Sequence, residues 1–95
     1  MLHTLNDSPW KNDLVAKLRL VQKGDVLLLL SDGVIAAVEG NRFLYILHAT
    51  PVALYALQED VEARGLSSQI ASSVLMVSYT EFVKFAVQHP VHFAW

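Results

Sequence analysis

Val26-Leu27-Leu28-Leu29-Leu30 is the stretch that decides the fold, because it is apolar at every position. Neighbouring side chains of a strand point to opposite faces of a sheet, so a strand built from this stretch needs cover on both faces. Such strands lie inside parallel sheets, where crossover helices pack on each side. We therefore predict a central parallel strand over residues 26–30.

Further candidate strands lie on both sides of this stretch in the chain, over residues 1–5, 52–57 and 73–78. Pro51 has no N–H to donate, which is typical of a strand start. Residues 91–95 offer a fifth strand. Because this tail ends in bulky aromatic side chains, which is unusual for a terminus expected to fray, we expect it to dock on another surface.

The segment between the first two strands predicts a helix. Ser8 followed by Pro9 is a typical helix start, and Gly24 is a plausible left-handed end. Apolar residues at helical spacing would share one face of this helix: Trp10, Leu14, Leu18 and Val21. Shorter helices are predicted over residues 34–38, 43–48 and 58–64.

The last helix has the clearest start signal, since Ser78 and Glu81 have the spacing of a capping box. Pro90 prevents the helix from continuing past His89. The alternation of strands and helices predicts an α/β fold, a three-layer sandwich with a parallel sheet of four to five strands and a flavodoxin-like arrangement. We expect residues 1–95 to form one domain.

The charge balance argues against nucleic acid as a direct ligand. The 95 residues include 7 Lys and Arg against 9 Asp and Glu, a formal charge of −2, whereas a free-standing nucleic-acid binder needs a basic surface. No apolar run approaches the roughly 20 residues of a membrane helix, and residues 1–11 lack a secretory signal. We therefore expect a cytoplasmic protein without a membrane partner.

Apolar residues are abundant, at 54% of the sequence against a usual share of roughly 45–50%. A domain of this length buries only about 60–68% of the surface of its unfolded chain, so we expect part of the surplus at a subunit interface. Residues 43–47 are five consecutive large apolar positions, and a helix made from them is apolar nearly all round. The alternative is an ordinary core face with a few scattered surface hydrophobes.

Reactive groups give weaker signals. The sequence has no cysteine, so it can form no disulfide, thiolate metal site or persulfide. Asp32, after the central strand, would form an acid–base pair if a histidine lay beside it, but Asp32-Gly33 is also typical of a turn. His89 and His92 are the closest pair among four histidines, and Pro90 disrupts the helical spacing of a metal site between them. No metal or other cofactor is expected.

Four segments carry a resemblance to a known family: MLHTLNDSPW at residues 1–10, GDVLLLLSDGVIAAVEGNRFL at 24–44, ALYALQEDVEARGL at 53–66 and YTEFVKFAVQHPVHFAW at 79–95. With these segments the chain resembles the TusB family, the DsrH-like subunits of the bacterial TusBCD sulfur-relay complex. The resemblance covers essentially the whole chain. It implies the DsrEFH-like α/β fold.

The resemblance also implies a function. It places the chain in a heterohexamer with TusC-like and TusD-like subunits, two copies of each, which serves 2-thiolation of the wobble uridine of tRNA. Persulfide sulfur passes through TusA to a cysteine of the TusD subunit and on through TusE. Because this chain has no cysteine, we expect a non-catalytic subunit that stabilises the complex.

Large aromatic and aliphatic side chains are the candidates for the subunit interface, because they lose little entropy when buried between subunits. The predicted interface set is Phe43, Tyr45, Ile46, Phe93 and Trp95. Two other functions stay open. One is a small flavodoxin-like domain that binds a ligand at the carboxyl ends of its strands, and the other is an acid–base enzyme that uses Asp32.

Overall fold

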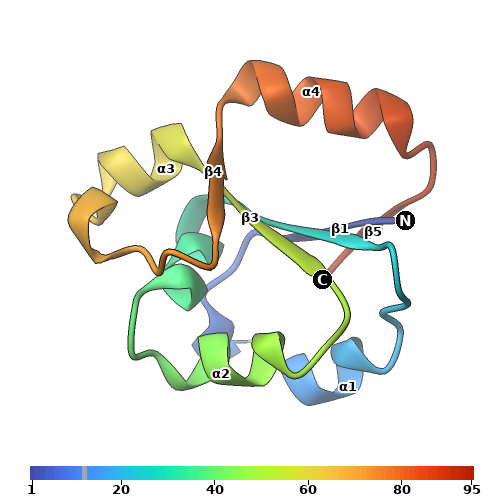
Figure 1. The fold of residues 1–95 in the computed structure, drawn as a ribbon, viewed down its shortest axis with the longest axis horizontal. Helices are drawn as coiled ribbons and strands as arrows, with labels where there is room; N and C mark the ends of the chain where they lie inside the picture. Colours follow the sequence, from blue (N-terminus) through green and yellow to red (C-terminus); the bar gives the residue numbers. More distant parts are fainter. Residues whose placement is uncertain (12) are drawn as a thin grey trace.

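Five parallel strands form the sheet at the centre of the molecule (Figure 1). The computed structural model describes residues 1–11 and 13–95. The strands are β1 (Leu2–Leu5), β2 (Val26–Leu29), β3 (Ala53–Leu57), β4 (Leu75–Val77) and β5 (His92–Ala94). All four residues of β2 are buried, and β2 is the middle strand of the order β4-β3-β2-β1-β5. The predicted central strand and the fifth strand are both confirmed.

Helices cover both faces of this sheet, which confirms the three layers (Figure 1). The helices are α1 (Leu14–Leu18), α2 (Arg42–His48), α3 (Gln58–Ala63) and α4 (Tyr79–Gln88), with 3-10 helices at Pro9–Lys11, Ser31–Ala37 and Ser67–Gln69. One face carries the large core under α1, α2 and the second 3-10 helix. The other face carries a small core under α4 alone.

The strand order explains this unequal cover. Strands β1 to β4 follow one another across the sheet, and β5 lies on the far side of β1. The chain therefore has to cross the whole sheet between β4 and β5, and α4 makes that crossing (Figure 1). Flavodoxin has the strand order 2-1-3-4-5, so the likeness to flavodoxin extends to the layers and not to the strand order.

The first predicted helix begins later than the sequence indicated. Residues Pro9–Lys11 form a 3-10 helix, and α1 begins after Asp13, whose carboxylate accepts the Ala16 N–H at 3.2 Å. The Ser8 hydroxyl accepts the Trp10 N–H, within the 3-10 helix and not at the start of α1. The predicted helix also ran through Asn12, which lies outside the described residues. Helix α1 ends at Leu18, so Gly24, with a φ of +93°, shapes the turn before β2 and does not end the helix.

The segment after β2 is a 3-10 helix and begins at once, with Ser31 at a φ of +51°. Gly33 lies inside this helix with ordinary backbone angles and is buried. A Cβ on Gly33 would lie 2.1 Å from the carbonyl oxygen of Leu5. The glycine is thus required by its close approach to β1, not by the turn conformation that the sequence suggested.

The later helices agree with the sequence. The capping box of α4 is present, since the Ser78 hydroxyl accepts the Glu81 N–H at 3.2 Å and the Glu81 carboxylate accepts the Ser78 N–H at 3.0 Å. Gly65, with a φ of +66°, follows the C-cap of α3. Phe82 and Phe85 of α4 pack on the small core.

Candidate subunit interface and adjoining pocket

Helix α2 buries one side and exposes the other. Phe43, Leu44 and Leu47 lie against the sheet, whereas Tyr45 is 81% exposed and Ile46 is half-buried. The short helix therefore has one ordinary core face, although its sequence is apolar nearly all round. Phe43 belongs to the core of its own chain and drops out of the predicted interface set. For Tyr45 and Ile46, a place in the subunit interface stays a prediction.

The tail also divides into a buried and an exposed part. Trp95 is buried in the large core, and its backbone N–H donates to the Thr4 carbonyl oxygen at 2.8 Å. All three residues of β5 are exposed, Phe93 among them. The tail docks on β1 of the same chain, so Trp95 leaves the predicted interface set and Phe93 stays in it.

A buried polar network holds the tail in place. The Trp95 indole N–H donates to His3 Nδ1 at 3.0 Å, which leaves the proton of the neutral imidazole on Nε2. His3 Nε2 then donates to the Asp25 carboxylate at 2.9 Å, and the same carboxylate accepts the Met1 amino group and the Gln22 N–H, each at 3.0 Å. Asp25 thus accepts hydrogen bonds from Met1, His3 and Gln22, and His3 links it to Trp95 at the other end of the chain.

The charge of Asp25 is well stabilised in this network. Burial by itself raises the pKa of the carboxyl group, but hydrogen bonds from His3 and the Gln22 N–H and the charge of the amino terminus lower it to about 2. His3 is fully buried. No sequence motif joins residues 3, 25 and 95, and the sequence reasoning missed this network.

Helix α4 carries a stripe of exposed apolar residues that the sequence reasoning also missed. Tyr79, Val83 and Val87 lie four residues apart and are all exposed. Residues at that spacing share one face of a helix, so the pattern was available in the sequence. We call these three residues the α4 stripe. It is a second surface on which a partner could bury apolar area.

Trp10 is another exposed aromatic residue, beside α2. Its ring meets the Phe43 ring edge to face, with centroids 4.8 Å apart. The Arg42 guanidinium lies over both rings, 4.8 Å from the Trp10 centroid and 5.0 Å from that of Phe43. These cation–π contacts hold the Arg42 guanidinium on the Trp10 side of α2.

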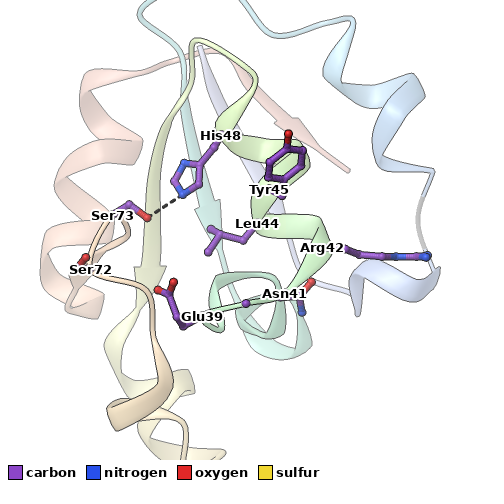
Figure 2. Close-up of a pocket in the computed structure, with 9 residues that line it drawn as sticks. Glu39, Asn41, Arg42, Leu44, Tyr45, His48, Ser72 and Ser73 are labelled. Atoms are coloured by element: carbon purple, nitrogen blue, oxygen red, sulfur yellow. Dashed lines mark hydrogen bonds between the residues drawn. The ribbon is translucent and has the colours of Figure 1, made fainter.

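A pocket of about 360 Å³ lies on the other side of α2 (Figure 2). Leu44, Tyr45 and His48 of the helix line it, together with Glu39 before the helix and Ser73 before β4. His48 Nε2 lies 2.8 Å from Ser73 Oγ, and this hydrogen bond joins α2 to the facing loop. The volume is in the range of small ligand sites. The pocket is not lined by the residues that directly follow the strands, where the alternative of a ligand-binding domain placed its ligand.

Asp32 lies at the carboxyl end of β2 without a histidine partner. Its carboxylate accepts from the Arg64 guanidinium at 2.9 Å, and Arg64 also donates to the Ser31 hydroxyl at 3.3 Å. The Ser31 N–H donates to the Asp60 carboxylate at 2.7 Å. The hypothesis of an acid–base pair between Asp32 and a histidine is therefore wrong in this structure.

The other histidines have separate partners. His92 Nε2 lies 3.1 Å from the Ala86 carbonyl oxygen of α4, and the His89 ring lies 6.4 Å from the Phe85 ring. In residues 1–11 and 13–95, no group of three or more His, Cys, Asp or Glu side chains is arranged to hold a metal ion.

Within residues 1–11 and 13–95, no helix combines the length and apolar character needed to cross a membrane.

The fold and surface define a class: a small α/β protein with five parallel strands in the order 4-3-2-1-5 and exposed apolar residues on the helices of both faces. Residues 7–92 match the family described as DsrH-like protein. The chain belongs to the DsrH-like family.

Curated relatives match the chain over its whole length. Protein TusB of Klebsiella pneumoniae (strain 342) is 59% identical, and protein TusB of Escherichia coli (strain K12) is 54% identical, each over 100% of both chains. Among solved structures, the crystal structure of the ychN protein from E. coli has a TM-score of 0.77 at 19% identity, covering 99% of this chain and 97% of that one. At that identity, the structure supports the fold alone.

Proposed function

We propose that this chain is a non-catalytic subunit of a sulfur-relay complex that serves 2-thiolation of the wobble uridine of tRNA. In this proposal it assembles in the cytoplasm with TusC-like and TusD-like subunits, two copies of each, and meets TusA and TusE through the complex. The tRNA is not bound by this chain directly. The TusD-like subunit carries the persulfide.

One observation carries the proposal: the chain matches proteins named TusB over its full length at 54–59% identity and yet has no cysteine. Each carrier in a persulfide relay needs a thiolate, so a cysteine-free member cannot carry the sulfur itself, which supports a role in holding the other subunits. Its exposed apolar residues support this role. Tyr45, Phe93 and the α4 stripe are the kind of side chains that subunit interfaces bury.

The direct test is co-expression with the TusC-like and TusD-like relatives of the same organism, followed by native mass spectrometry. The expected product contains two copies of each subunit. In cells that lack this chain, we expect 2-thiouridine in tRNA, measured by mass spectrometry of nucleosides, to fall and to return when the chain is supplied again. An isolated chain that stays a stable monomer and ignores both relatives would contradict the proposal.

A second candidate function is favoured by one observation, the pocket of about 360 Å³ beside α2. A domain that binds a small ligand there would work without partner subunits. Calorimetry of the chain with nucleotides and flavins separates this candidate from the first. Binding of any of them at micromolar concentration would support it, and the absence of heat with all of them would remove it.

A further inference from the structure

The pocket beside α2 has an acidic group without a partner. The Glu39 side chain is exposed and makes no hydrogen bond or ion pair with residues 1–11 or 13–95, although its backbone N–H is held by the Gln69 carbonyl oxygen at 2.8 Å. Its carboxylate points up toward Leu44 and the space below His48 (Figure 2). The backbone is thus fixed while the charge is left available.

The nearest basic residue does not neutralise this charge. Arg42 lines the same pocket, but its guanidinium turns away from the other lining side chains (Figure 2) and lies over the Trp10 and Phe43 rings on the far side of α2. Among the residues that line the pocket in the described part of the chain, it is the only Lys or Arg. The charge of Glu39 is therefore not paired by a lining residue of the pocket.

The remaining lining groups suit a long basic side chain. Leu44 is almost completely buried and gives the pocket an apolar wall for methylene groups. Ser73 Oγ, held by His48, can accept an N–H from a group that also pairs with Glu39. Tyr45 stands at the rim with its ring exposed, where it can stack on a planar cation.

We propose that this pocket receives a basic side chain, best an arginine, from a partner subunit. The inference rests on the proposed function, because it needs a partner. A lone exposed carboxylate holds a free amine weakly, since water screens the pair. A subunit docked over Tyr45 would exclude that water and strengthen the pair. Arginine fits better than lysine because its planar guanidinium can bind both carboxylate oxygens at once.

The test uses the co-expressed complex and changes only the charge in the pocket. Glu39→Gln removes the charge and Glu39→Lys reverses it. Because Glu39 is exposed, both variants should fold like the unchanged chain, which their thermal unfolding checks. Asp7→Asn and Asp7→Lys are the matched controls, since Asp7 is an exposed acid outside the pocket.

We expect Glu39→Gln to weaken binding of this chain to its relatives by about tenfold and Glu39→Lys by more, as measured by dissociation of the co-expressed complex on dilution. The Asp7 controls should change binding by less than about twofold. A single Arg→Glu or Lys→Glu change in one relative should restore binding to the Glu39→Lys variant. Glu39 variants that bind like the unchanged chain would overturn the inference.

The outcomes separate this inference from the proposed function. If the unchanged chain does not bind its relatives, both proposals are wrong. If it binds them and the Glu39 variants bind equally well, only the arginine pocket is wrong. If N-acetyl-argininamide binds the isolated chain at micromolar concentration and the complex is insensitive to Glu39, the pocket is a site for a free small cation, and the partner side chain is excluded.

Discussion

Asp25→Asn is the change that most directly tests the buried network between the two ends of the chain. The pKa of Asp25 falls from 3.8 to about 2 on folding. Each pKa unit corresponds to about 1.36 kcal/mol, so the charge of Asp25 stabilises the folded chain by about 2 kcal/mol at neutral pH. Asparagine keeps the size of the side chain but loses the charge that the Met1 amino group and His3 share.

The pH dependence gives the prediction its sign. The folded state holds Asp25 ionised more strongly than the unfolded state does, so its stabilisation is complete above pH 3.8 and is lost as the pH falls toward about 2. The asparagine variant lacks this stabilisation at every pH. The difference between the two proteins should therefore be largest at neutral pH and shrink steadily below about pH 4.

Urea unfolding of the dilute chain, followed by tryptophan fluorescence, measures both effects. Trp95 is buried and becomes exposed on unfolding, whereas Trp10 is already exposed. Asp7→Asn is the control, since Asp7 is an exposed aspartate, and it should change the free energy of unfolding by less than about 0.5 kcal/mol. Equal stabilities of the unchanged chain and the Asp25→Asn variant at neutral pH, or a difference that stays constant on acidification, would refute the reasoning.

Three further predictions concern packing, the surface of α2 and the start of α4. Gly33→Ala places a Cβ 2.1 Å from the Leu5 carbonyl oxygen, and we expect a loss of about 3 kcal/mol in urea unfolding; an unchanged midpoint would contradict it. Phe43→Ala should cost about 3–5 kcal/mol as a core deletion, whereas Tyr45→Ala should leave unfolding nearly unchanged and weaken binding to the relatives; the reverse result would exchange their roles. Ser78→Ala should cost about 1 kcal/mol, measured by thermal unfolding, because the Glu81 N–H loses its cap.

The central part of the fold was predictable because its signals are local. An all-apolar run such as residues 26–30 allows few placements other than a covered strand, and the capping box of Ser78 and Glu81 is a pattern four residues long. The start of α1 was not predictable in this way. Ser8 and Asp13 are both good N-cap residues, and the sequence does not say that residues 9–11 fold as a separate 3-10 helix.

The candidate site was predictable only in part, because exposure is set by contacts distant in the sequence. Nothing near Trp95 indicates that His3, on the neighbouring strand, accepts its indole N–H. The exposed and buried sides of α2 depend on which face meets the sheet, and five consecutive apolar residues do not reveal that. The pocket joins residues 39–48 to residues 72–73, a pairing that follows from the topology and not from a motif.

The network that joins both chain ends through His3 and Asp25 has a practical consequence for anyone who purifies this protein. An affinity tag fused before Met1 replaces the amino group that pairs with Asp25, and a tag fused after Trp95 has to leave from a buried residue. Either tag would disturb these contacts, and the loss of stability would be mistaken for a loss of partner binding. Residues 22–24, in the exposed turn before β2, also adjoin Asp25 through Gln22. The exposed turn at Gly40, near the pocket, is equally unsuitable, so a label is best attached away from the chain ends, the pocket and the α4 stripe.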